Sequence, residues 1–222
     1  MSNTNGTAVK RERLAAGAGL IFVVLFIGAL SDPVVDPIGD DASLVARQLL
    51  DNRVQGRVAV YAGGLAALAL VWFVGSLRST LRRAEGGTGR LSAVAFAGGV
   101  LAGGTILASS AFSWAALEFA DYGNDPAGAR LAAAFAEYLF YSANFGTALL
   151  VGATFVVALR HGAIPLWLAW VGAVGGALSL VFFWPFIVLG GMVFLFWVAA
   201  LSIVLIRRGS QERGDSSPPS VT

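Results

Sequence analysis

Apolar residues in this chain form near-continuous runs rather than one-sided stripes, and short polar or charged segments separate the runs. About 20 apolar residues in a helix cross a hydrocarbon core of about 30 Å. Four runs reach or approach this length, at about 14–30, 58–77, 91–117 and 131–159. The pattern therefore predicts transmembrane helices rather than the amphipathic helices of a soluble core.

The last apolar stretch, 165–206, is too long for a single crossing, because about 40 helical residues would span about 60 Å. Its middle, 182–186, reads Phe-Phe-Trp-Pro-Phe. Proline disfavours helix in the residue before it, and aromatic side chains suit the headgroup region. We therefore expect a turn there between two further spans, at about 165–183 and 186–206, and six spans in all.

The polar segments complete this prediction. Residues 1–13 form a basic tail, and the run after them is too long for a signal peptide, so we expect a retained anchor. The Ser- and Pro-containing segment 207–222 is predicted to be disordered. Asp40 or Asp41 is placed to cap a short amphipathic helix in the first polar loop. The apolar face of that helix has helical spacing and comprises Ala42, Val45, Ala46, Leu49 and Leu50.

The charges indicate an orientation. If both termini are cytoplasmic, eleven of the fifteen basic residues fall inside. The four outside are Arg47, Arg53, Arg57 and Arg130. This distribution satisfies the positive-inside rule. The expected fold is all-α, a polytopic bundle of six transmembrane helices in a bacterial cytoplasmic membrane, with both termini cytoplasmic and the amphipathic helix in the first outer loop.

Composition supports a membrane protein and narrows its chemistry. The chain is 57% hydrophobic and 13% charged, against about 25% charged in soluble domains. It has no cysteine and one histidine, His161, so we expect no metal or other cofactor. Enzyme motifs are absent, and only Glu118, Asp121 and Glu137 offer weak catalytic candidates, so an enzyme is disfavoured. Four aspartates of the first loop lack the EF-hand pattern and are interpreted as solvated turns: Asp32, Asp36, Asp40 and Asp41.

Glu137 is the ionisable residue that lies well inside an apolar run. Tyr141 and Asn144 follow it at spacings of four and seven, and Thr147 continues the series, so all four share one face of a helix. Glu137 is seven residues, about 10 Å, from Arg130. This depth places it in the outer third of the membrane.

Two interpretations of Glu137 remain open. In the structural interpretation, the carboxylate reaches the outer interface or is held by Ser113 and neighbouring tyrosines. The hydroxyls of Ser110 and Ser113 lie at similar depths on the preceding span and are the expected hydrogen-bond partners of this helix. Alternatively, Glu137, Tyr141 and Asn144 form a proton, cation or ligand site, because acids inside membranes are costly and often functional. Burial would favour the protonated acid and permit exchange of a proton for a cationic substrate. Trp114, beside Ser113, is either an interfacial anchor or part of the pocket wall.

Glycine pairs at a spacing of four indicate how the helices pack, and the packing suggests a function. Gly99 and Gly103, and Gly172 and Gly176, are typical of close helix packing, with hinges as the alternative. The favoured function is a structural or accessory membrane protein that packs through these glycine faces with itself or a membrane partner. The alternative is a small-molecule or ion transporter or ligand-binding protein, using an outer-facing groove between spans three and four. The lipid bilayer is an expected partner, and nucleic acid is not.

Three segments carry a resemblance to known proteins. Residues 46–53 read Ala-Arg-Gln-Leu-Leu-Asp-Asn-Arg, residues 75–83 read Gly-Ser-Leu-Arg-Ser-Thr-Leu-Arg-Arg, and residues 164–170 read Ile-Pro-Leu-Trp-Leu-Ala-Trp. Over about 11–208 the chain resembles uncharacterised six-span integral membrane proteins of actinobacteria, including a bacterial membrane family defined as a domain of unknown function. The resemblance implies the topology and supplies no catalytic or binding residues.

Overall fold

The computed structural model describes the backbone of residues 4–30, 35–181 and 184–214, and the side chains of 17–30, 35–181 and 188–207. This part of the chain is all-α, with seven helices and no strand. The helices are α1 (Thr4–Ala29), α2 (Ala42–Asp51), α3 (Arg53–Glu85), α4 (Arg90–Asp121), α5 (Pro126–His161), α6 (Leu166–Ser179) and α7 (Trp184–Gly214).

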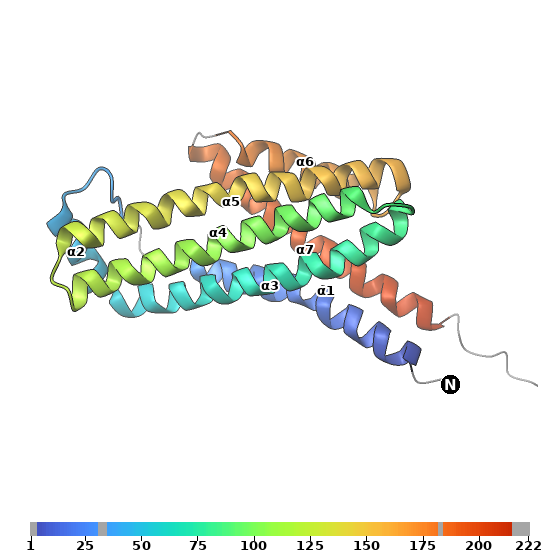
Figure 1. The fold of residues 1–222 in the computed structure, drawn as a ribbon, viewed down its shortest axis with the longest axis horizontal. Coiled ribbons are helices and arrows are strands. Elements are labelled where there is room, and N and C mark those ends of the chain that lie inside the picture. The colour runs from blue at the N-terminus through green and yellow to red at the C-terminus, as the bar shows by residue number, and fades with distance from the viewer. Residues whose placement is uncertain (1–3, 31–34, 182–183, 215–222) are drawn as a thin grey trace, which may run out of the picture.

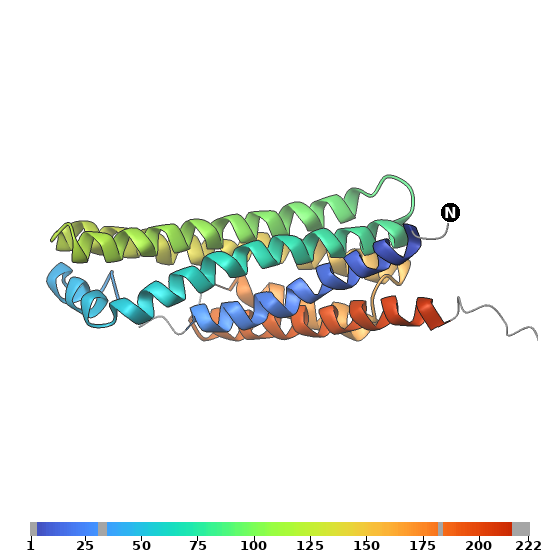
Figure 2. The same cartoon turned by 90° about the horizontal axis from the view of Figure 1, so that it is seen from below.

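Six of the helices form a closed ring (Figures 1 and 2). Each contacts its two neighbours in the order α1, α3, α4, α5, α6, α7, and α7 returns to α1. The short helix α2 stands outside this ring and packs on α4 and α5, with a smaller contact to α3. Helices α3, α4 and α5 extend past the ends of α1, α6 and α7 toward α2 (Figure 1).

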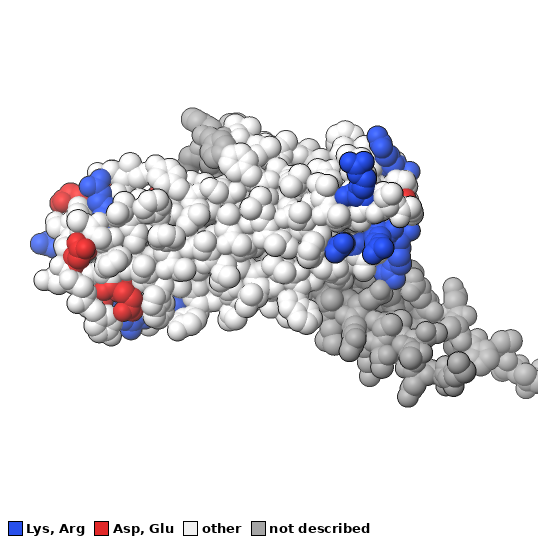
Figure 3. Space-filling view, viewed as in Figure 1, with Lys and Arg blue, Asp and Glu red and all other residues white. Residues whose placement is uncertain are grey.

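The two ends of the bundle differ in charge. Helix α1 begins and α7 ends at the same end of the molecule (Figure 1), where blue side chains gather in Figure 3. We call this the arginine end, after Arg82 and Arg83 in the last turn of α3, Arg90 at the start of α4 and Arg160 in the last turn of α5. The opposite end, which carries α2 and most of the acidic side chains, is the α2 end (Figure 3).

Within the described residues, four helices are long and apolar enough to cross a membrane: α3, α4, α5 and residues 188–207 of α7. Two further apolar helical stretches, Gly17–Ala29 and Leu166–Ser179, are shorter. The helical chain breaks within a few residues of the predicted turn, because α6 ends at Ser179 and α7 begins at Trp184.

Several predicted boundaries need correction. The second, third and fourth runs belong to helices of 33, 32 and 36 residues, because the arginines and alanines flanking each run are good helix formers. Helix α1 begins at Thr4, ten residues before the predicted first span. Helix α7 continues to Gly214, so the predicted disorder from residue 207 is wrong as far as 214. Residues 31–34 and 215–222 lie outside the described residues, and with them Asp32.

The core is one large cluster inside the ring and one small cluster under α2. Phe22, Phe73 and Trp197 are 0% exposed in the large cluster. The small cluster places Val45 and Leu49 of α2 against alanines of α4 and α5. The amphipathic face predicted for residues 42–50 therefore forms, and it packs on protein.

The glycines of the predicted packing motifs face helices of the same chain. A Cβ built at Gly99 would lie 2.5 Å from Val74 of α3, and one at Gly172 would lie 2.6 Å from Trp197 of α7. The closest approach is between α4 and α5. There a Cβ at Gly98 would lie 2.5 Å from the Leu150 nitrogen, and one at Gly146 would lie 2.5 Å from the Ala102 nitrogen.

Candidate functional site

A cavity of about 560 Å³ lies inside the ring toward the α2 end. Residues of α1, α2, α3, α4, α5 and α7 line it, together with Ser179 at the end of α6. Sites for small molecules usually have about 300–1,000 Å³ and a mostly apolar wall with a few polar groups. The cavity is therefore of ligand size, and it is broader than the predicted groove between spans three and four.

The cavity arises from a change of side-chain size along α3. Near α2 the buried face of this helix presents Gly56, Ala59 and Gly63 to the cavity. Closer to the arginine end the same face carries Leu70 and Phe73, which are 0% exposed. Small residues leave space that the larger ones fill, and protein interiors otherwise pack without such voids.

One wall of the cavity is polar. Helix α5 contributes Glu137, Tyr141, Asn144 and Thr147, which line the cavity as their shared helical face predicts. Helix α4 adds three hydroxyls to the same wall: Ser109, Ser110 and Ser113. The opposite wall is apolar and consists mainly of residues from α1 and α7, among them Phe22, Phe26, Val188, Met192, Phe194 and Leu195.

Glu137 is held by a residue of its own helix. The Tyr141 hydroxyl donates a hydrogen bond of 2.7 Å to Oε1 of Glu137. This contact joins positions four residues apart, which are neighbours on a helix surface. In the described part of the chain no arginine or lysine lies within ion-pair distance of Glu137, so its hydrogen-bond partner is a neutral phenol.

Of the two kinds of partner expected to hold Glu137, a neighbouring tyrosine does so, and the serines of α4 do not. The Ser110 hydroxyl donates to the Ile106 carbonyl, four residues back in its own helix, as helical serines often do. Ser109 makes the contact between the two helices, donating to the Ala136 carbonyl over 2.7 Å. Among the described residues, the side chains of Ser113 and Asn144 have no protein hydrogen-bond partner, and both line the cavity.

Trp114 is not among the residues that line the cavity, so of its two interpretations the place in the pocket wall is wrong. Its ring packs edge-on against Tyr61 of α3, with 5.3 Å between centroids. The Arg57 guanidinium lies 5.9 Å from the Trp114 ring centroid. Ser113 and Trp114 are consecutive residues, so their side chains are about 100° apart around the helix and point to different neighbours.

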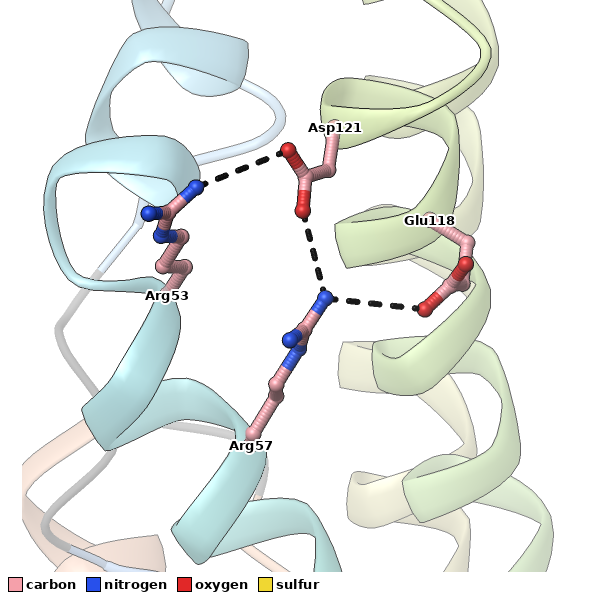
Figure 4. A network of polar contacts seen from close by, with 4 residues as sticks. All are labelled: Arg53, Arg57, Glu118 and Asp121. Carbon is pink, nitrogen blue, oxygen red and sulfur yellow. Dashed lines mark hydrogen bonds and ion pairs between the residues drawn. The ribbon is translucent and has the colours of Figure 1, made fainter.

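Arg57 also joins an ionic network that clamps α3 to α4 at the α2 end (Figure 4). It lies 3.2 Å from Asp121 and 3.9 Å from Glu118, and Arg53 lies 3.7 Å from Asp121. These arginines form ion pairs with Glu118 and Asp121, the two weak catalytic candidates. The sequence signal was available, because Arg53 and Arg57 are four apart and Glu118 and Asp121 three apart, so each pair shares a helix face.

The segment before α2 covers the cavity at this end, and its Pro37 belongs to the lining. Arg130 of α5 holds the segment by donating to the carbonyls of Pro37, at 2.8 Å, and Ile38, at 3.2 Å. Asp36 accepts hydrogen bonds from the backbone N–H groups of Gly39 and Ile38. These bonds hold the pKa of Asp36 below its ordinary value, because they stabilise the charged carboxylate.

Comparison with known proteins finds no matching family model, no matching curated protein and no matching solved structure.

Proposed function

We propose that this chain is a multi-pass protein of a bacterial cytoplasmic membrane that binds an amphiphilic small molecule in the cavity near its α2 end. The observation that carries the proposal is the cavity itself, with its size of about 560 Å³ and its polar wall opposite an apolar one. Unfilled space in a protein core lowers stability. Ligand binding would explain why the bundle contains this much unfilled space.

The proposed topology has six crossings with both termini in the cytoplasm. Two features support it: α1 begins and α7 ends at the same end of the bundle (Figure 2), and that end carries the arginines of α3, α4 and α5. In this orientation α2 and the cavity face the outside. The ring is filled at the arginine end by residues such as Phe73 and Trp197, so a ligand in the cavity is reached from the outer side or from the outer leaflet.

A structural or accessory role is the second candidate. It is supported by the close α4–α5 approach, which makes one rigid unit of the two helices. The glycines expected to meet a partner are engaged within the chain, however: Gly99 faces Val74 and Gly172 faces Trp197. A partner would therefore have to use other surfaces, and for this reason we rank ligand binding first.

Filling the cavity tests the proposal. Gly191 of α7 lines the cavity, and a Cβ built there meets no atom within 4 Å. Gly191→Leu therefore adds volume at a position where the first added carbon meets no atom. Gly152→Leu is the matched control, because Gly152 of α5 has equally open surroundings and is not among the lining residues. Both variants gain helix propensity to a similar degree.

The measurement is fluorescence of the neutral amphiphile 1-N-phenylnaphthylamine with purified protein in nanodiscs, relative to protein-free nanodiscs. We expect saturable binding to the wild type and to Gly152→Leu, and at least about tenfold weaker binding to Gly191→Leu, a loss of about 1.4 kcal/mol. Equal binding to all three proteins, or no saturable binding to the wild type, would refute ligand binding in this cavity.

A further inference from the structure

The charge inside the cavity restricts what can bind there. Glu137 is the one charged residue among the described residues that line it. The nearest arginine on the same helix, Arg130, is engaged with the carbonyls of Pro37 and Ile38. Arg57 is engaged with Asp121 and Glu118. A carboxylate in such surroundings is costly unless a cation or several hydrogen bonds compensate it.

The hydrogen bond to Tyr141 gives only partial compensation. It occupies Oε1 of Glu137, which leaves Oε2 without a protein donor among the described residues. The Tyr141 oxygen still has lone pairs, because its hydroxyl is the donor in that bond. Together the carboxylate and the phenol present two acceptors to the cavity. An alkylammonium group carries three donors and one positive charge, and therefore matches them.

The two walls define the rest of the ligand. The side chain of Asn144 lies seven residues, about 10 Å, further into the bundle than Glu137. It lines the cavity and has no hydrogen-bond partner among the described residues. The facing wall is apolar, with Phe26 of α1 and Met192 and Leu195 of α7. A molecule that fills the cavity therefore has an apolar body against α1 and α7 and polar groups toward α5.

We propose that the cavity binds a cationic amphiphile, with its ammonium group on Glu137 and Tyr141, its apolar body against α1 and α7, and a hydrogen-bonding group within reach of Asn144. This inference rests on the proposed function, because it names the class of ligand for the same site. Glu137 supplies the charge that selects a cation over a neutral molecule of equal length. Asn144 orients the ligand along the cavity.

Two displacing ligands of equal chain length test the charge. Dodecylamine is protonated at pH 7, whereas dodecanol is neutral, and both are used to displace 1-N-phenylnaphthylamine from protein in nanodiscs. A charge-assisted hydrogen bond is worth about 1.5–3 kcal/mol. We therefore expect the amine to displace the probe at a concentration about tenfold or more below that of the alcohol.

Glu137→Gln keeps the shape of the side chain and removes its charge. We expect this variant to lose the preference for the amine over the alcohol. Glu118→Gln is the matched control, because Glu118 lies outside the cavity lining, and it should keep the full preference. Probe binding by each variant shows that it is folded.

The outcomes separate the two proposals. Failure of the probe to bind the wild type refutes the binding function itself. Probe binding with equal displacement by amine and alcohol leaves the binding function intact and refutes the cationic ligand. A preference for the amine that persists in Glu137→Gln also refutes the assignment to Glu137, since partition of the amine into the bilayer would then explain it.

Discussion

The same pair of helices, α4 and α5, packs in two different ways at its two ends. Toward the arginine end, Gly98 and Gly146 bring the backbones into direct contact. Toward the α2 end, the two helices are linked by the Ser109–Ala136 hydrogen bond and form one wall of a cavity of about 560 Å³. Both halves are rich in small residues, so small residues alone do not decide whether a helix pair encloses space.

The residues facing the pair from α3 explain the difference. Opposite the Gly98 region, α3 presents Leu70 and Val74, which fill the interior. Opposite the serines, it presents Gly56 and Gly63, and the interior stays open. A small residue therefore permits close packing where the facing helix supplies bulk, and creates a cavity where the facing helix is small as well.

The largest effect is expected from Gly146→Ala. The added Cβ would lie 2.5 Å from the Ala102 nitrogen and 2.6 Å from the Gly98 oxygen, and backbone atoms cannot yield as a side chain can. We expect a loss of about 3 kcal/mol in unfolding free energy, measured as thermal or denaturant unfolding in nanodiscs. Gly152→Ala on the same helix, with no atom within 4 Å of its Cβ, should be neutral or slightly stabilising. Equal effects would remove the distinction between the two halves.

An intermediate effect is expected from Ser109→Ala. This change removes the hydrogen bond to the Ala136 carbonyl, and such bonds between membrane helices contribute about 0.6 kcal/mol on average. We expect a loss of about 1 kcal/mol in the same unfolding assay. Ser142→Ala is the control, because Ser142 donates to the Tyr138 carbonyl within its own helix. Removing this hydrogen bond should lower the unfolding free energy by less than Ser109→Ala does. A loss as large as that of Gly146→Ala would show that the cavity half is packed as firmly as the other.

The smallest effect is expected at Asp36, in the segment that covers the cavity. The pKa of Asp36 is lowered in the folded protein by the N–H groups of Gly39 and Ile38. Its stabilising contribution is therefore present above the unfolded pKa of about 3.9, and it is lost as the pH falls through the lower folded value.

Asp36→Asn tests this dependence. We expect a Tm below that of the wild type at pH 7, by less than for Ser109→Ala because Asp36 is exposed. We expect the difference to shrink as the pH is lowered below the unfolded pKa of about 3.9. A difference that stays constant with pH would show that the carboxylate charge does not hold the cover of the cavity.

The sequence predicts the helices better than their contacts. Apolar runs located every long helix, and the Phe-Phe-Trp-Pro-Phe segment located the break between α6 and α7, because hydropathy and proline act locally. Helix ends were underestimated, since arginine-rich flanks such as 78–83 continue a helix beyond the apolar run. The six-span count, the orientation and the resemblance to actinobacterial membrane proteins stay predictions.

The candidate site was predicted in part. The spacing of Glu137, Tyr141 and Asn144 places them on one face, and they do line one cavity. The hydrogen-bond partner was predicted in part. Neighbouring tyrosines were among the expected partners and Tyr141 is the one that binds, whereas the expectation for Ser113 rested on depth alone. The predicted groove between spans three and four was narrower than the cavity, because the cause of the extra space, the change from Gly56 to Phe73 along α3, becomes visible only when the facing helix is known.

The hydrogen bond within α5 also bears on how the chain is made. Helix α5 precedes α6 and α7 in the sequence, so during synthesis it stands in the membrane before the ring can close between α7 and α1. A partner on α6 or α7 would leave Glu137 without a hydrogen bond in lipid during that interval. Because Tyr141 is one turn away, the bond forms as soon as α5 is helical, and the acid enters the membrane already shielded.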